Sequence, residues 1–317
     1  MSDDENSGYR AVYIEFSGCS CAVAFICNPF WRGIKWGKGG NFLESIYDKI
    51  KLHNGVEMPV LGLGVYKVEQ GNQIEETIHT ALELGYRLID TASFYQNEEG
   101  VGMAIRNSGI PREELFITSK VWNSDQGYDN ALRAFDDSLE KLGLEYLDLY
   151  LIHWPVKGKY IETWRALEKR YQEGRVKAIG VSNFTIHHLQ DLLSQSKEGP
   201  VINQVELHPL LAQTELREYC RQNDIAVEAW SPLSRGRFLN EPILGNIADR
   251  HGKTPAQVIL RWHLQHDIIP IPKSVTPSRL KENADVFNFR LSEQEIAEID
   301  GLNKEQRFGA DPDYIDF

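Results

Sequence analysis

Four side chains of different chemistry lie at or just after the ends of short apolar runs and are the first candidates for a reaction centre. Asp90, Lys120 and His153 each end such a run, and Tyr95 follows Asp90 within a few residues. A phenol, whose pKa is about 10, is a poor acid at neutral pH unless a cation lowers that pKa. Lys120 can supply the cation, and Asp90 can hold its ammonium group charged and oriented. The set predicts a general acid, Tyr95, whose pKa is tuned by an ammonium–carboxylate pair. Tyr95 would protonate the carbonyl oxygen of a substrate, and His153 could bind and orient that same oxygen.

Eight short apolar runs, each followed by a polar residue and then by a segment with helical spacing, recur along the chain. This alternation predicts an α/β fold of the (β/α)8 TIM-barrel type. A doubly wound sheet would need a Gly-x-Gly-x-x-Gly turn after its first strand, which the sequence lacks. Because the C-terminal strand ends of a barrel meet at one face, this fold would gather the four candidates. The eight runs are Leu61–Gly64, Arg87–Asp90, Leu115–Lys120, Asp148–His153, Ala178–Asn183, Val201–His208, Ala226–Ser231 and Ile268–Ser274.

The chain divides into two parts, an N-terminal extension and a barrel domain. Residues 1–46 mix acidic, Gly-rich and Trp-bearing pieces without a helix or strand period. We expect them to be a disordered extension, or one that results from a start site assigned too far upstream, rather than a regulatory or anchoring arm. Residues 47–317 form the barrel domain. It begins with alternating runs around Asn54-Gly55, a pattern that predicts a β-hairpin with a type I′ turn.

The composition is that of a globular, acidic protein. The 317 residues are 42% hydrophobic and 25% charged, with a net charge of −12, which makes nucleic acid a poor partner. Four cysteines, three of them between residues 19 and 27, predict neither a disulfide framework nor a complete zinc site. No apolar run approaches the ~20 residues of a membrane span, and the acidic N-terminus is unlike a signal peptide. We expect a cytoplasmic protein without a membrane partner and without a bound metal.

Six sequence motifs occur in the order typical of the aldo-keto reductases, a family that the chain resembles from about Lys49 to its C-terminus. Within that family, the sequence is most similar to bacterial members that reduce glyoxal, methylglyoxal or diketogulonate. The resemblance implies a catalytic tetrad of Asp90, Tyr95, Lys120 and His153. Relatives that reduce steroid double bonds carry Glu in place of His153, so the histidine implies carbonyl reduction. The motifs are Asp90-Thr91-Ala92 with Tyr95, Ser119-Lys120-Val121-Trp122, Leu151-Ile152-His153-Trp154-Pro155, Gly180-Val181-Ser182-Asn183-Phe184, Asn203-Gln204-Val205-Glu206 and Ile271-Pro272-Lys273-Ser274.

The resemblance also implies an NADP(H) cofactor bound across the mouth of the barrel. Ser182, Asn183 and Gln204 would hold the nicotinamide carboxamide, and Trp230 would stack on the ring where many members carry Tyr. Lys and Arg beside a helix N-terminus make a phosphate site, which favours NADP over NAD. The implied cofactor residues are Ser182, Asn183, Gln204, Trp230, Ser231, Leu233, Lys273, Ser274 and Arg279, with Glu282 and Asn283 on the adenine side.

The implied function is the NADPH-dependent reduction of small aldehydes, ketones and dicarbonyls to alcohols, by an oxidoreductase that acts on CH–OH groups. The family leans towards monomers, so we expect a monomer. Tyr66, Trp122 and Trp154 would wall the substrate pocket. The tail after Leu302 is short, which predicts an open and permissive pocket.

Two alternatives from other functional classes stay open. One is a non-enzymatic, nicotinamide-binding regulatory subunit, which turnover of a simple aldehyde would exclude. The other is a metal-dependent barrel isomerase, in which Asp90, Glu206, His208 and Glu228 would point inward and hold a divalent cation. The second alternative leaves Tyr95 and Lys120 unexplained.

Overall fold

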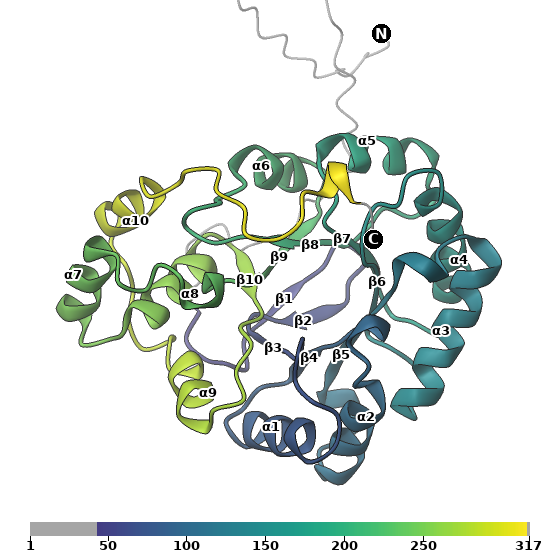
Figure 1. Ribbon diagram of the computed structural model, residues 1–317, viewed down its shortest axis with the longest axis horizontal. Coiled ribbons are helices and arrows are strands. Elements are labelled where there is room, and N and C mark those ends of the chain that lie inside the picture. The colour runs from purple at the N-terminus through teal and green to yellow at the C-terminus, as the bar shows by residue number, and fades with distance from the viewer. Residues whose placement is uncertain (1–42, 316–317) are drawn as a thin grey trace, which may run out of the picture. The chain divides into compact units, whose positions relative to one another are not determined.

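Eight parallel strands form one sheet, in which the strands lie side by side in chain order (Figure 1). The structure is a computed structural model that describes residues 43–315. Helices alternate with the strands and surround the sheet, so the predicted (β/α)8 barrel is confirmed. The strands are β3 (Gly62–Gly64), β4 (Leu88–Asp90), β5 (Phe116–Val121), β6 (Leu149–Ile152), β7 (Ile179–Ser182), β8 (Ile202–Glu206), β9 (Ala226–Trp230) and β10 (Ile268–Pro270).

Glycine residues bring the first strand close to the segment that follows the last one. The amide of Gly64 donates a hydrogen bond to the carbonyl oxygen of Pro272 over 3.3 Å. A Cβ atom at Gly62 would lie 2.9 Å from Ile271 Cγ2, and one at Gly64 would lie 3.0 Å from the Ile271 carbonyl oxygen. Small residues on β3 therefore permit the approach that almost closes the barrel.

The helices pack around the barrel, and Figure 1 shows them as an outer ring. They are α1 (Asn72–Glu83), α2 (Glu98–Asn107), α3 (Tyr128–Leu142), α4 (Tyr160–Gln172), α5 (Ile186–Gln195), α6 (Thr214–Gln222), α7 (Pro242–His251), α8 (Pro255–Gln265), α9 (Pro277–Ala284) and α10 (Glu293–Asp300). Thr254 Oγ1 accepts a hydrogen bond from the Gln257 amide over 3.3 Å and caps α8. Ser292 caps α10 in the same way, through the Glu295 amide. These capping boxes satisfy backbone donors that a helix start leaves free.

The predicted hairpin is present, but its turn differs from the predicted type. Strands β1 (Lys49–Lys51) and β2 (Glu57–Pro59) pair antiparallel, with Ile50 opposite Met58. The Gly55 amide donates to the Leu52 carbonyl over 2.9 Å, and Gly55 has a φ of 91° while Asn54 is not in the positive-φ region. A type I′ turn requires positive φ at both residues, so the loop is instead a three-residue turn with glycine in the bulge position.

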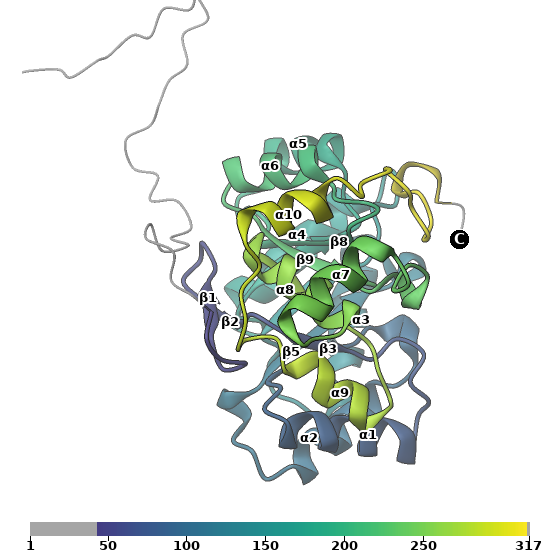
Figure 2. The same ribbon diagram turned by 90° about the vertical axis from the view of Figure 1, so that its left-hand side faces the viewer.

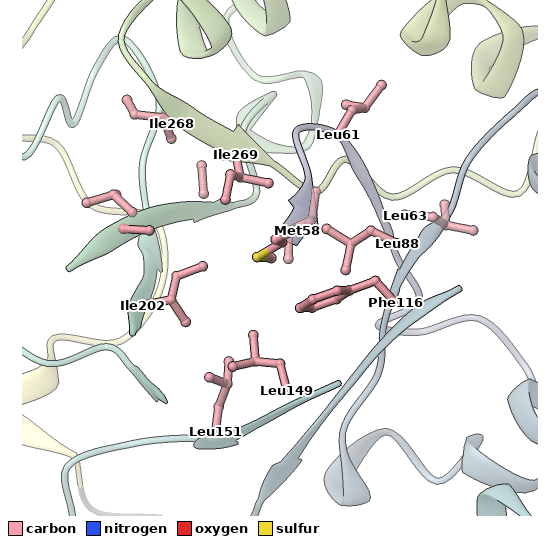
Figure 3. Packing of buried hydrophobic residues seen from close by; sticks show 14 of the residues in the cluster. Met58, Leu61, Leu63, Leu88, Phe116, Leu149, Leu151, Ile202, Ile268 and Ile269 are labelled. Carbon is pink, nitrogen blue, oxygen red and sulfur yellow. The ribbon is translucent and has the colours of Figure 1, made fainter. Parts of the chain in front are cut away.

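The hairpin lies across one end of the barrel, opposite the face that the C-terminal residues cross (Figure 2). Its Met58 is fully buried and lies among Leu88, Phe116 and Ile269, which come from three barrel strands (Figure 3). This end of the barrel is therefore filled with apolar side chains, and polar chemistry is left to the other end.

The N-terminal extension lies almost wholly outside the described residues, including Cys19, Cys21 and Cys27. Of the described part, Leu43 and Ile46 pack against the hydrophobic core. The domain boundary at residue 46 stays a prediction. No helix between residues 43 and 315 is both long enough and apolar enough to cross a membrane.

We expect Gly102→Ala to destabilise the barrel, because a Cβ atom there would lie 2.0 Å from the carbonyl oxygen of Leu142 at the end of α3. Overpacking of this kind costs about 1–3 kcal/mol. The matched control is Gly245→Ala, also in a helix, where nothing lies within 4 Å of the added atom. That change should be neutral or should stabilise by up to about 1 kcal/mol. Urea unfolding of both variants measures the difference, and equal midpoints would contradict the prediction.

Candidate active site

A cavity of about 840 Å³ opens at the C-terminal ends of the barrel strands. Most of the predicted site residues line it, in the position where barrels of this kind carry their active sites. Lys120 is fully buried behind this surface, and Ser274, Arg279, Glu282 and Asn283 lie outside the cavity. The predicted residues that line it are Tyr66, Asp90, Tyr95, Trp122, His153, Trp154, Ser182, Asn183, Gln204, Trp230, Ser231, Leu233 and Lys273.

A buried ion pair joins β4 and β5 at the base of the cavity. The Lys120 ammonium lies 2.6 Å from Asp90 Oδ1 and also donates to the Thr91 carbonyl oxygen over 3.0 Å. Its third partner is the hydroxyl of Tyr95, at 3.3 Å. Tyr95 lies in the short 3-10 turn η1 (Ser93–Tyr95), which follows β4 directly. The structure therefore brings these three predicted residues into direct contact.

The pKa values around the ion pair differ in one respect from the prediction. Burial alone would lower the pKa of the Lys120 ammonium, but Asp90 and Tyr95 raise it, and the net pKa lies above its ordinary value. For Tyr95, burial raises the pKa to about 12, although the charge of Lys120 acts to lower it. The charge of Lys120 thus acts to lower the pKa of Tyr95, as predicted, but the effect of burial is larger. Tyr95 therefore holds its proton throughout the neutral range.

His153 completes the predicted tetrad at the cavity wall. Burial, followed by the nearby charge of Lys120, holds the pKa of its imidazole well below the usual range, so the ring is neutral. The ring lies edge-on to Tyr95, with ring centres 5.7 Å apart. Its Nδ1 atom is buried without a hydrogen-bond partner among residues 43–315. A neutral imidazole beside the phenol can donate one N–H to a bound oxygen.

The residues predicted to hold the carboxamide form one hydrogen-bonded group. Asn183 Nδ2 donates to the His153 carbonyl oxygen over 2.9 Å, and the indole N–H of Trp230 donates to Asn183 Oδ1 over 2.8 Å. Ser182 Oγ donates to the carbonyl oxygen of Gln204 over 2.8 Å. Asn183 takes a left-handed backbone conformation, with a φ of 65°. These contacts give the polar wall of the cavity a defined geometry before any ligand binds.

The residues predicted to bind phosphate lie at the start of α9. Lys273 is exposed at the cavity rim, where partial burial lowers the pKa of its ammonium group. Arg279 is exposed in the first turns of α9, and neither cation has an ion-pair partner in the described part of the chain. Ser274 Oγ accepts a hydrogen bond from the Thr276 amide over 3.1 Å. Two unneutralised cations beside a helix N-terminus suit an anionic ligand.

On the adenine side, Glu282 is already engaged within the protein. Its Oε1 atom accepts a hydrogen bond from Thr254 Oγ1 over 2.5 Å. Asn283 is buried in the same helix, α9. Glu282 and Asn283 thus lie on the same helix as Arg279. Their roles in binding the adenine stay predictions.

The aromatic side chains that were predicted to wall the substrate pocket line the cavity, together with one that was not predicted. The ring of Tyr66 lies 5.0 Å from that of Tyr95, measured between ring centres. Trp122 stacks on Phe94, with centres 3.8 Å apart and planes tilted by 17°. Phe94 lines the cavity but carries no motif of its own, so the sequence analysis missed it. Its position directly before Tyr95 was the available signal.

The C-terminal segment also lines the cavity, and the open, permissive pocket stays a prediction. Glu206 Oε1 accepts a hydrogen bond from the Phe308 amide over 2.8 Å, and Oε2 accepts one from the Gly309 amide over 2.9 Å. Gly309 and Ala310 line the cavity beside Trp230. A Cβ atom at Gly309 would lie 2.4 Å from the Trp230 ring, so glycine permits this close approach. The C-terminal segment is short, and its hydrogen bonds to Glu206 hold it at one side of the cavity.

The metal-dependent alternative finds no support in these positions. Asp90 pairs with Lys120, Glu206 binds backbone amides of the C-terminal segment, and Glu228 accepts from Gln204. His208 Nε2 donates to Glu206 Oε1 over 3.2 Å. Across residues 43–315, the His, Cys, Asp and Glu side chains that cluster closely enough to hold an ion are His187, His188 and Asp313, none of which was a predicted ligand.

The barrel and its polar pocket define a class of protein, and sequence comparison gives that class a name. The chain belongs to the aldo/keto reductase family, whose sequence model matches residues 60–304. It is similar to the glyoxal reductase of Bacillus subtilis (strain 168), with 58% identity over 273 residues, 86% of this chain and 99% of the relative. It is also similar to the methylglyoxal reductase DkgA of Escherichia coli (strain K12), with 49% identity over 268 residues, 83% of this chain and 96% of the relative.

A solved structure agrees with these sequence relatives. A mutant of Gox0644, crystallised in complex with NADPH, has a TM-score of 0.82 and 46% identity to this chain. The match covers 85% of this chain and 99% of that chain. The resemblance inferred from the six motifs is therefore confirmed.

We expect Glu206→Gln to loosen the C-terminal segment, because an amide nitrogen cannot accept from a backbone N–H group. Burial acts to raise the pKa of Glu206, but hydrogen bonds from His208, Gly309 and Phe308 hold it below its usual value, so the native carboxylate is ionised. One unpaired amide should cost about 1–3 kcal/mol of unfolding free energy. Hydrogen exchange should also rise over residues 305–312. Glu76→Gln, at an exposed position of α1, is the control; unchanged exchange in the Glu206 variant would overturn the assignment.

Proposed function

We propose that this protein is an NADPH-dependent reductase that converts small aldehydes, ketones and dicarbonyls, of the glyoxal and methylglyoxal kind, to alcohols. The observation that carries the proposal is the phenol of Tyr95, held 3.3 Å from the buried ammonium of Lys120 at the base of the cavity. The phenol keeps its proton at neutral pH, and the ammonium group beside it can stabilise the phenolate that forms when that proton is transferred. The glyoxal and methylglyoxal reductases among the relatives support the substrate class.

The protein's own residues manage the proton and the oxygen of the substrate. Tyr95 donates its phenolic proton to the carbonyl oxygen as negative charge develops there. Lys120, held charged by Asp90, stabilises the phenolate that remains until it regains a proton from solvent. The neutral imidazole of His153 donates a second hydrogen bond to the same oxygen and orients it. NADPH, when bound, supplies the hydride that goes to the carbonyl carbon, so that hydride and proton together yield the alcohol.

The cavity suits the cofactor on two independent grounds. Its polar wall carries an amide, that of Gln204, and the aromatic face of Trp230, which match a carboxamide and a flat ring. Among the described residues, Lys273 and Arg279 have no ion-pair partner. Two such cations near the start of α9 suit a 2′-phosphate more than the two hydroxyls of NAD ribose. The solved relative in complex with NADPH supports the same choice.

A small substrate is in keeping with a pocket that is walled by aromatic rings. Tyr66, Trp122 and Trp154 line the cavity together with the Gly309 segment. Flat apolar walls accept short carbonyl compounds without demanding specific polar contacts. The cytoplasmic location and the monomeric state stay predictions that rest on composition and on the family.

Purified protein should oxidise NADPH in the presence of methylglyoxal. We expect kcat/KM with NADPH to exceed that with NADH by at least about tenfold, because charge-assisted hydrogen bonds contribute about 1.5–3 kcal/mol. The absorbance of the reduced nicotinamide measures both rates. NADPH binding without turnover, across several aldehydes, would favour the regulatory-subunit alternative. Absence of binding together with a stoichiometric metal would favour the isomerase.

Two variants of one helix check the phosphate site in the same assay. Arg279→Gln should narrow the preference for NADPH over NADH by raising the KM for NADPH alone. Lys281→Gln is the matched control, because Lys281 is an exposed cation on the same helix and is not one of the predicted phosphate binders. If both changes raised the KM for NADPH equally, the effect would come from the net charge of the helix and not from a contact between Arg279 and the phosphate.

Tyr95→Phe should remove the proton donor and leave the cofactor site intact. We expect kcat to fall by a factor of about 10²–10⁴, the usual contribution of general acid catalysis, while the Kd for NADPH is nearly unchanged. Isothermal titration gives the Kd, and initial rates give kcat. A variant that kept most of its turnover would refute the proposed acid.

A further inference from the structure

A second buried carboxyl group, which the mechanism does not use, lies beside the catalytic ion pair. Glu228, on β9, is fully buried and pairs in register with Gln204 on β8. Gln204 Nε2 donates to Glu228 Oε2 over 2.7 Å and to Asp90 Oδ2 over 2.8 Å. The other oxygen of Glu228, Oε1, has no hydrogen-bond partner in the described part of the chain. One side-chain amide therefore bridges two buried carboxyl groups.

The chemistry of the amide decides which way it faces. Its nitrogen carries two N–H donors and its oxygen accepts, whereas an ionised carboxylate only accepts. With both N–H groups engaged by Asp90 and Glu228, the carbonyl oxygen Oε1 is the polar atom of Gln204 left for a ligand in the cavity. Turning the amide over would place Oε1 against the buried carboxylate of Asp90 and leave two acceptors in contact, which is costly away from water.

We propose that Glu228 is a positioning residue for the nicotinamide end of the cofactor, acting with Asp90 to hold Gln204 so that its carbonyl oxygen is free to accept from the carboxamide N–H groups. The inference rests on the proposed function, since it assumes that NADPH binds in this cavity. Gln204 makes the contact, and Glu228 has no contact of its own with the cofactor. Neither the motifs nor the proposed proton transfer assigns Glu228 a role.

The charge state of Glu228 gives this role a distinctive signature. Burial, and then the negative charge of Asp90, raise the pKa of Glu228 to about 8, while the hydrogen bond from Gln204 and the charge of Lys120 act in the opposite direction. The partner in register on β10, Ile269, carries no charge. Glu228 is thus protonated and neutral at pH 7, and it becomes an anion as the pH rises through about 8.

An anion at this position distinguishes the two redox forms of the cofactor. The nicotinamide ring is positively charged in NADP⁺ and neutral in NADPH, so ionised Glu228 attracts the oxidised form only. By linkage, the affinity for NADP⁺ relative to NADPH should increase as the pH rises through the pKa of Glu228. A group with a merely structural role would not produce this dependence.

Two variants separate the hydrogen bond from the charge. Glu228→Leu removes the acceptor, so we expect the Kd for NADPH at pH 7 to rise about tenfold. Glu228→Gln keeps a carbonyl oxygen that can accept from Gln204 Nε2, so its Kd at pH 7 should stay close to that of the wild type. The Gln variant cannot ionise. Its ratio of Kd values for NADP⁺ and NADPH should therefore be flat across pH 8, where the wild-type ratio should fall several-fold.

Isothermal titration with NADPH and with NADP⁺, at pH values on either side of 8, measures all these quantities without turnover. Thermal unfolding checks that each variant is folded, and if the Leu variant is not, the pH profile of the Gln variant still decides. A wild-type pH dependence that persists in Glu228→Gln would overturn the role of Glu228, as would an unchanged Kd in a folded Glu228→Leu. Failure of the wild-type protein to bind NADPH would instead contradict the proposed function.

Discussion

The ion pair between Lys120 and Asp90 constrains the rest of the site, because both charges are removed from water. Lys120 is fully buried and Asp90 nearly so. Such a pair is tolerated only when further hydrogen bonds satisfy its remaining donors and acceptors, and loss of one partner leaves an uncompensated buried charge that costs about 3–5 kcal/mol. Here the Thr91 carbonyl and the Tyr95 hydroxyl accept the remaining hydrogen bonds of the Lys120 ammonium group. Gln204 donates a hydrogen bond to the second oxygen of the Asp90 carboxylate. The side chains that we propose as catalytic are therefore also ones whose loss would destabilise the fold.

One buried ion pair also explains the charge state of its neighbours. The same low-dielectric surroundings that require Lys120 and Asp90 to compensate each other disfavour any further charge. His153 is driven to its neutral form, Tyr95 keeps its proton, and Glu228 is protonated at pH 7. Three titratable groups next to the ion pair are thus neutral at pH 7. A neutral donor beside a fixed cation suits a reaction in which negative charge appears on an oxygen only at the moment of transfer.

The sequence predicted the features that depend on local pattern and missed those that depend on distant backbone. Apolar runs that end in polar residues predicted all eight strands, and the strand ends placed Asp90, Lys120 and His153 at one face. The turn at Asn54-Gly55 was assigned the wrong type because the same two residues suit a two-residue turn and a three-residue turn with a bulge. The contacts of Glu206 with the amides of Phe308 and Gly309 span about a hundred residues. Backbone amides leave no side-chain signature, so this fastening of the tail could not be inferred. The pKa of Tyr95 required a burial that only the folded structure supplies.

The two ends of the barrel divide the tasks of folding and chemistry. At the hairpin end, Met58 and its apolar neighbours fill the interior with groups that need no partners (Figure 3), and their burial stabilises the strands. At the other end, the buried polar side chains of Asp90, Lys120, Gln204 and Glu228 form one hydrogen-bonded set. Within residues 43–315, Oε1 of Glu228 and Nδ1 of His153 are buried without a hydrogen-bond partner. Because unsatisfied buried atoms raise the free energy of the folded state, the apolar end must offset their cost. Tight apolar packing at the hairpin end of the barrel can therefore compensate for buried polar atoms without hydrogen-bond partners at the cavity end.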